Sequence, residues 1–147
     1  MKILQVNCVY GQGSTGKIVQ DIHTQLLENH FQSVVCYGRG TTTIVPNIYK
    51  ICCEFYAKIN KLISKFTGIM YGGCFFSTQK LIHIIKKESP DVVHLQCING
   101  NFVNIYRLLS WLKKNRIKTV LTLHAEFMYT GGCSYSIDCN QWSTQEG

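Results

Sequence analysis

The stretch Gly11-Gln12-Gly13-Ser14-Thr15-Gly16-Lys17 decides the fold class of this chain. An apolar run at residues 3–9 precedes it, and apolar side chains recur at helical spacing over residues 18–27. A strand, a glycine-rich turn and a helix in this order form the first part of a βαβ unit. The glycines allow a tight turn close to a ligand, and the first N–H groups of the helix lack partners within it. We therefore predict contact with a phosphate or diphosphate, made by Gly11, Gly13, Ser14, Thr15, Gly16 and Lys17.

This loop matches two phosphate-binding signatures, and each match is incomplete. The spacing G-x-x-x-x-G-K is typical of a nucleotide-binding P-loop, but Ile18 occupies the place of the hydroxyl that should reach Mg²⁺. The spacing G-x-G-x-x-G is typical of dinucleotide binding, but the second strand leads into Arg39 instead of an acidic residue for the ribose. Arg39 would suit only a 2′-phosphate, so an NADP-dependent reductase-type domain remains an alternative. A non-enzymatic module that binds a nucleotide or a membrane surface is a second alternative function. For the loop itself, the alternative is a glycine turn that only packs the helix on the strand.

The rest of the chain alternates strands and helices. This alternation predicts an α/β fold with a doubly wound, mainly parallel, Rossmann-like sheet. In such a sheet ligands bind beyond the carboxyl ends of the strands, so the loops 11–17, 96–100 and 124–126 should face one crevice. We expect strands near residues 3–9, 33–37, 44–48, 91–96 and 119–123, and helices near residues 16–29, 49–66, 77–88 and 102–115, with Ser77 as the cap of the third helix.

Composition is that of one cytosolic globular domain. The chain has 147 residues, of which 46% are hydrophobic, so disorder is excluded. Its first residues form a strand and not a secretory signal, and no apolar run reaches the roughly 18 residues of a membrane span. The chain holds 8 cysteines, several of them in apolar stretches. We expect Cys8, Cys36 and Cys97 to be reduced and slow to react.

The net charge of +7 favours an anionic partner, either a phosphorylated substrate or an anionic membrane surface, and favours nucleic acid less. The predicted helix at residues 49–66 contributes Lys58, Lys61 and Lys65, with apolar residues such as Phe55 and Ile59 on its other side. Such a helix either covers one face of a sheet or lies on a membrane surface. We expect the first arrangement, in which a charge at Phe55 or Ile59 would destabilise the domain by roughly 2–5 kcal/mol.

Three segments give the chain a family resemblance. The segments KILQVNCVYGQGSTGKI (residues 2–18), PDVVHLQCINGNFVNIYRLL (90–109) and TVLTLHAEFMYTGGCSYSIDCNQW (119–142) resemble the N-terminal half of family 4 glycosyltransferases. These are retaining enzymes of the GT-B fold, from the branch that builds bacterial surface polysaccharides. The glycine loop is a common motif, whereas the histidine-bearing last segment with its GGC…DC…W pattern is more specific. The resemblance extends from Met1 to about Trp142.

The resemblance implies half of a two-domain enzyme. Residues 1–142 would form the acceptor-side Rossmann-like domain, residues 143–147 an unstructured tail, and the donor domain with its E-x7-E motif would be absent. The complete enzyme would be a hexosyltransferase that moves a sugar from a nucleotide-sugar donor to a glycan or lipid-linked acceptor. We expect the chain alone to be inactive. Its expected location is the cytoplasm, with peripheral contact at the inner membrane face as an alternative.

The resemblance also implies roles for individual residues. The glycine loop would approach the donor diphosphate, and His124 and Glu126 would serve the catalytic centre, with His124 against the transferred sugar. No cofactor and no metal are expected. A packing role is the alternative for His124, and His94 could equally be a core residue. The residues expected on the acceptor side are His94, Asn99 and Tyr129, and the two thiols spaced C-x5-C, Cys133 and Cys139, are not assigned to a metal.

Overall fold

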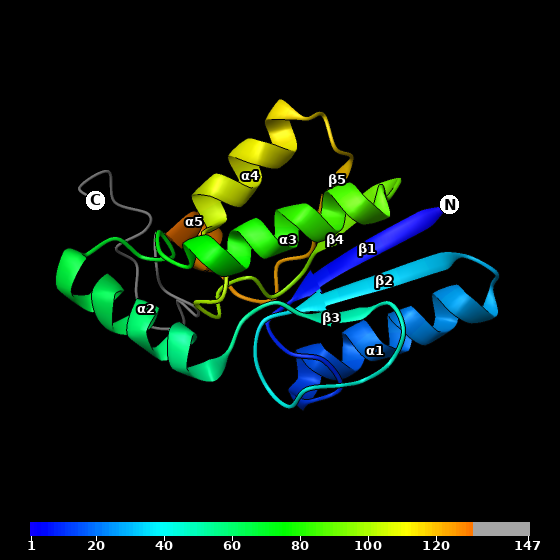
Figure 1. Cartoon of the computed structure of the whole chain (residues 1–147), viewed down its shortest axis with the longest axis horizontal. Helices are drawn as coiled ribbons and strands as arrows, with labels where there is room; N and C mark the ends of the chain where they lie inside the picture. Colours follow the sequence, from blue (N-terminus) through cyan, green and yellow to red (C-terminus); the bar gives the residue numbers. More distant parts are fainter. Residues whose placement is uncertain (131–147) are drawn as a thin grey trace.

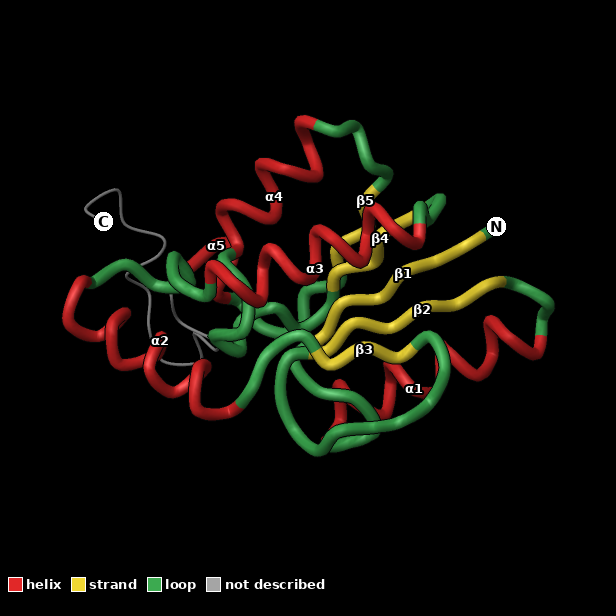
Figure 2. Tube along the Cα trace, viewed as in Figure 1, coloured by secondary structure: helices red, strands yellow, loops and turns green. Residues whose placement is uncertain are grey.

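The computed structural model describes residues 1–130 and consists of a five-stranded parallel sheet with helices around it (Figures 1 and 2). The strand order is β3-β2-β1-β4-β5, and every neighbouring pair is parallel. The predicted α/β, doubly wound, Rossmann-like class is therefore confirmed. The strands are β1 (Lys2–Asn7), β2 (Gln32–Tyr37), β3 (Ile48–Lys50), β4 (Val92–Leu95) and β5 (Thr119–Leu121). The helices are α1 (Gly13–Glu28), α2 (Glu54–Thr67), α3 (Phe75–Glu88), α4 (Ile105–Lys114) and α5 (Phe127–Thr130).

The strands β1 and β2 are largely buried on both faces, as in most parallel sheets, whereas the edge strand β5 is exposed. Helix α1 lies on one face, and α3 and α4 lie on the other (Figure 1). Alternate residues of β2 show the division: Val34 and Cys36 join the larger core, whereas Val35 and Tyr37 join a smaller core under α1. The larger core includes Leu4, Val6, Leu81, Ile85, Val93, Leu95 and Leu108, and the smaller one also contains Val19 and Ile48.

The chain reverses its direction of winding between β1 and β4. From β1 it proceeds through α1 to β2 and β3 on one side, and it then returns through α2 and α3 to β4 on the other side of β1. The connections from β1 and from β4 therefore leave the sheet in opposite directions, which opens a crevice at the carboxyl ends of these two strands. The glycine loop follows β1 and residues 96–100 follow β4, so these two of the three predicted loops reach this crevice.

Several predicted boundaries are wrong, each for a local reason. The strand expected at 44–48 begins only at Ile48, after a proline at position 46 that cannot donate to a ladder, and Ile44 is 98% exposed. Ser77 does not cap α3, because the N-cap is Cys74 and the buried Ser77 hydroxyl donates instead to the Phe102 carbonyl at 2.5 Å. Helix α4 starts at Ile105 because the Asn104 side chain accepts a hydrogen bond from the Arg107 N–H at 2.9 Å.

The expectation that the helix at 49–66 covers the sheet is also wrong. Helix α2 lies beyond the carboxyl ends of the strands and not over a sheet face (Figure 1). Its buried residues are Ala57 and Asn60, whereas Phe55 is 74% and Ile59 39% exposed. A charge at Phe55 or Ile59 should therefore not disrupt the core. The Asn60 amide attaches the helix, since its Oδ1 accepts from the Cys74 N–H at 2.7 Å. Among the helices of residues 1–130, none is long and apolar enough to cross a membrane.

Gly38 offers a direct test of this packing. It follows β2, and a Cβ added there would lie 2.1 Å from Cγ of Phe102, a fully buried ring of the larger core. We expect Gly38→Ala to lower the free energy of unfolding by about 1–3 kcal/mol, because the ring has to move inside a packed core. Urea denaturation of the variant checks this, with Ile44→Ala in the exposed connection at residues 44–47 as the control. Equal stability of both variants would contradict the close contact.

Candidate active site

Two glycines of the loop are used by the turn itself. Gly11 and Gly13 have φ angles of +66° and +62°, which favour glycine. The Gly11 N–H donates to the Gly16 carbonyl at 3.0 Å, and a Cβ on the buried Gly16 would lie 3.0 Å from Cγ2 of Val9. The amide of Gly11 is therefore engaged within the loop, and Gly16 allows α1 to pack against the chain that leaves β1. Gly11 and Gly16 therefore support the alternative in which the glycines only shape the turn and pack the helix on the strand.

The start of α1 nevertheless keeps the properties of an anion site. The N-cap is Gln12, whose side chain donates to Thr41 Oγ1 at 2.7 Å and makes no cap hydrogen bond, and the first turn holds no acidic residue. Within the described part of the chain, the first N–H groups of the helix thus keep no side-chain cap. Ser14 and Lys17 are exposed beside them. A helix N-terminus with a nearby lysine can bind a phosphate group.

The loop after β4 is bonded to the end of β1, near the start of α1. The Cys97 N–H donates to Asn7 Oδ1 at 2.9 Å, and the Cys97 thiol donates to Asn99 Oδ1 at 2.9 Å. Burial raises the pKa of the Cys97 thiol, and its hydrogen bond with the Thr15 side chain partly opposes that rise. Asn7 is fully buried at the end of β1. Cys97 therefore links the loop after β4 both to the end of β1 and, through Thr15, to the loop 11–17.

A chain of buried amides connects His124 to α1. His124 Nε2 lies 3.3 Å from Gln96 Oε1, Gln96 Nε2 donates to Gln5 Oε1 at 2.8 Å, and Gln5 Nε2 donates to the carbonyl of Val19 at 3.4 Å. Gln5 is 0% and Gln96 2% exposed. Because a carbonyl can only accept, each amide is oriented in turn, and Gln96 presents its oxygen to the imidazole. In this arrangement Nε2 of His124 faces the Gln96 oxygen as the hydrogen-bond donor.

The remaining predicted site residues lie in different surroundings. His94 is in the middle of β4, where its Nε2 lies 2.8 Å from Thr122 Oγ1, and its pKa is lowered by burial and by the nearby His124. Glu126 is half-buried shortly after β5. Asn99 lines a cavity of about 500 Å³. Tyr129 belongs to α5, and its side chain lies outside the description, as do Cys133, Cys139 and the tail at 143–147.

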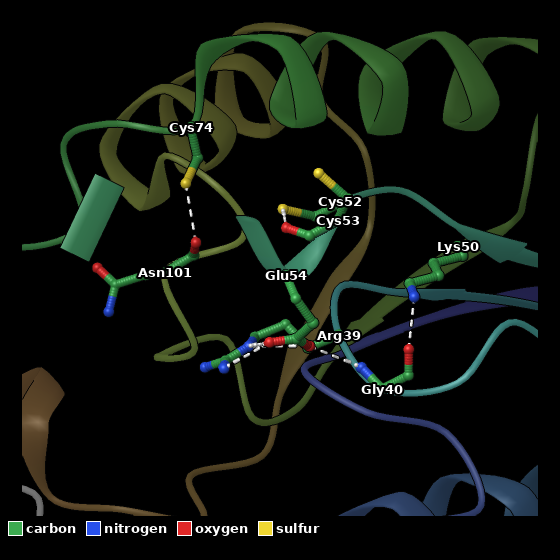
Figure 3. A network of polar contacts seen from close by, with 8 residues as sticks. All are labelled: Arg39, Gly40, Lys50, Cys52, Cys53, Glu54, Cys74 and Asn101. Carbon is green, nitrogen blue, oxygen red and sulfur yellow. Dashed lines mark hydrogen bonds and ion pairs between the residues drawn. The ribbon is translucent and has the colours of Figure 1, made fainter. Parts of the chain in front are cut away.

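Arg39 is held in an ion pair and is not directed to a ligand. Its Nη2 lies 2.8 Å from Glu54 Oε2, its Nε donates to the same carboxylate at 3.1 Å, and the Gly40 N–H donates to Oε1 at 3.0 Å (Figure 3). The Lys50 ammonium reaches the Gly40 carbonyl. Hydrogen bonds from Arg39 and Gly40 lower the pKa of Glu54 to about 2. The guanidinium that the reductase alternative needs for a 2′-phosphate is thus already occupied.

The described cysteines are free thiols in buried or half-buried places, apart from the exposed Cys53. Burial raises the pKa of Cys8 to about 11 and that of Cys74 to about 12, and it also raises the pKa of Cys36. These shifts agree with the expectation that Cys8, Cys36 and Cys97 react slowly. Residues 1–130 contain no group of three His, Cys, Asp or Glu side chains that could hold a metal ion.

Comparison with known proteins identifies a distant relative of this chain. WcaC of Escherichia coli (strain K12), named as a colanic acid biosynthesis glycosyl transferase, is 24% identical to this chain over 156 residues. The alignment covers 98% of this chain and 38% of the relative, so the chain spans less than half of the relative's length. No protein family model and no solved structure match the chain. The weak homology supports a glycosyltransferase at a coarse level, and it does not favour a reductase.

Two glutamine substitutions test the amide chain. Gln5→Leu and Gln96→Leu should each lower the free energy of unfolding by about 1–3 kcal/mol, because each leaves the other buried amide without its partner. The double variant leaves neither amide unpaired, so its loss should be clearly smaller than the sum of the two single losses. Urea unfolding of all four proteins measures this coupling. Additive losses would mean that the two side chains do not interact.

Acid titration tests the Arg39–Glu54 pair. The pKa of Glu54 in the folded protein is below its ordinary value of 4.5, so the pair stabilises the fold above that pH and loses this contribution as the pH falls toward about 2. Both side chains are partly exposed, and we expect Glu54→Gln to cost at most about 1 kcal/mol at pH 7 and almost nothing near pH 2. Thermal unfolding as a function of pH measures this loss of stability, with Glu28→Gln on α1 as the control. A cost for Glu54→Gln that is the same at both pH values would rule out the charged pair as its origin.

Proposed function

We propose that this chain is the acceptor-side half of a retaining GT-B glycosyltransferase in polysaccharide synthesis. The observation that carries the proposal is the connection of His124, through Gln96 and Gln5, to the helix whose N-terminus faces the same crevice. The name of the relative supports the reaction class. The substrates would be a nucleotide-sugar donor and a glycan or lipid-linked acceptor.

The start of α1 is the proposed place for the donor diphosphate. The N–H groups of its first turn, from Ser14 onward, would donate to phosphate oxygens, and the exposed Lys17 would add a positive charge. Gly11 and Gly16 act indirectly, because they shape the turn and let α1 approach. Since the phosphate leaves with the nucleotide, these groups would also stabilise the charge that develops on it during transfer.

His124 is the proposed contact to the transferred sugar. With Nε2–H directed at Gln96, Nδ1 would accept a hydrogen bond from a sugar hydroxyl when the ring is neutral. Because Gln96 holds the imidazole ring in one orientation, this contact would keep one geometry. His124 would therefore contribute to catalysis by positioning the sugar. We propose Glu126 as a second polar contact at the same strand end, and Asn99 as a contact on the acceptor side. His94 lies within β4 near His124, and we propose that it supports the acceptor side.

The proposed complete site needs a second domain. A GT-B site forms where two Rossmann-like domains close on one cleft, and the chain spans 38% of the length of its relative. We expect residues 1–147 alone to bind nucleotide-sugars with millimolar or weaker affinity and to transfer none, because donor contacts worth more than ~4 kcal/mol would be missing. Isothermal titration with UDP- and GDP-hexoses measures the binding, and NADPH serves as the comparison. Micromolar binding of NADPH, without comparable binding of the nucleotide-sugars, would favour the reductase alternative.

The activity test joins this chain to the part of the relative that it does not cover. Residues 1–147 joined to the remaining C-terminal segment of WcaC should transfer sugar from one of these donors, and His124→Ala should lower the rate about 10²-fold or more. His30→Ala, at an exposed histidine after α1, should leave the rate unchanged. Robust transfer by residues 1–147 alone would contradict the two-domain proposal. Full activity of His124→Ala would contradict only the role of that histidine.

A further inference from the structure

Helix α2 presents an apolar stripe away from the protein. At about 100° per residue, five large apolar side chains fall on one side of the helix, about 150° from the side that carries the buried Ala57 and Asn60. An amphipathic helix that packs on its own protein would show the reverse arrangement. The five are Phe55 (74% exposed), Ile59 (39%), Leu62 (55%), Ile63 (49%) and Phe66 (84%), and we call them the α2 stripe.

The stripe continues onto the start of α3. Phe76 is 73% exposed, its ring lies 6.2 Å from that of Tyr56 on α2, and its N–H donates to the Tyr56 hydroxyl at 3.3 Å. Phe75, 53% exposed, packs edge-on against Phe76 at 5.6 Å and carries the Arg107 guanidinium over its face at 4.1 Å. The result is an exposed aromatic and aliphatic surface built from two helices, which marks an interaction site.

A row of lysines borders the stripe. Lys58, Lys61 and Lys65 lie together about 100° around the helix from the centre of the stripe, between it and the buried side. The only carboxylate of α2 is Glu54, and Arg39 already binds it. Within residues 1–130 these three lysines form no ion pair. An exposed apolar stripe beside such lysines fits the boundary of an anionic bilayer, where the apolar side chains enter the acyl region and the ammonium groups meet lipid phosphates.

We infer that the α2 stripe and its lysine row form a docking surface for an anionic lipid bilayer. The inference rests on exposure and charge alone and does not depend on the proposed function. It does connect with the candidate site, because Lys61 and Lys65 line the cavity of about 500 Å³ that also includes Asn99 of the loop after β4. Docking through α2 therefore brings the bilayer to the carboxyl edge of the sheet, where α2 lies (Figure 1).

Vesicle binding by the full chain tests the inference. Cosedimentation is measured with vesicles of phosphatidylcholine alone and of phosphatidylcholine and phosphatidylglycerol in equal parts. We expect binding to the anionic vesicles that weakens with salt. The double variant Leu62→Ser/Phe66→Ser should lose at least about ten-fold in affinity, since it removes two exposed apolar groups from the stripe. Circular dichroism confirms that the variant is folded, and Ile44→Ser, at another exposed apolar residue, is its control.

A charge comparison separates the lysine row from the net charge of the chain. Replacement of Lys58, Lys61 and Lys65 by Gln should weaken binding about 10²-fold, at roughly one ten-fold factor or less per lysine. The same replacement at the exposed Lys113, Lys114 and Lys118 removes equal charge elsewhere and should change binding far less. In vesicles with brominated acyl chains, the fluorescence that Phe66→Trp adds to that of the two native tryptophans should be quenched, and the fluorescence that Ile44→Trp adds should not.

Three results would overturn the inference. One is the absence of binding to either kind of vesicle. A second is equal loss of binding in the two lysine triple variants, which would show a general charge effect. The third is a dimer of the parent protein, detected by light scattering, together with no binding of the parent protein to vesicles. Leu62→Ser/Phe66→Ser would dissociate this dimer. In that case the α2 stripe would be a contact between two copies of the chain.

Discussion

The buried hydrogen bond between Gln96 and Gln5, 2.8 Å long, is the interaction on which the candidate site depends. It joins the loop after β4 to the central strand β1 at the point where the direction of winding reverses. Two amides that are almost completely buried tolerate only a few arrangements, because each polar atom needs a partner. The backbone carbonyl of Val19 at one end fixes the orientation of both amides, and thereby which atom of Gln96 faces His124 at the other end.

The glycines around this crevice have different structural roles. Gly11 and Gly16 close the turn and allow α1 to approach, which leaves the first N–H groups of the helix at the carboxyl edge of the sheet. Gly38 gives room to the Phe102 ring, and a Cβ on Gly100 would lie 2.2 Å from the sulfur of Cys8. Close backbone approach therefore keeps the loops after β1, β2 and β4 together, and the polar contacts of Asn7 and Cys97 hold them.

Arg39 and helix α2 illustrate how one contact changes the interpretation of several residues. At the end of β2 an arginine indicates a 2′-phosphate, but Glu54 at the start of α2 binds it from the side. This pair, together with the bonds of Asn60 to Cys74, attaches α2 by its polar residues at the carboxyl edge of the sheet. The apolar residues of the helix are then free to face outward, and the lysines stay beside them.

The sequence by itself determined the strand–glycine–helix beginning, the α/β class and the loops that meet at one edge, because apolar periodicity and glycine spacing are local properties. It also marked His124 as a strand-end residue. Only the tertiary structure decided that Gln5 and Gln96 bond to each other across 91 positions, that Arg39 is occupied, and that α2 turns its apolar side outward. Helical periodicity reports that a helix has two sides, whereas the contacts of distant residues decide which side is buried.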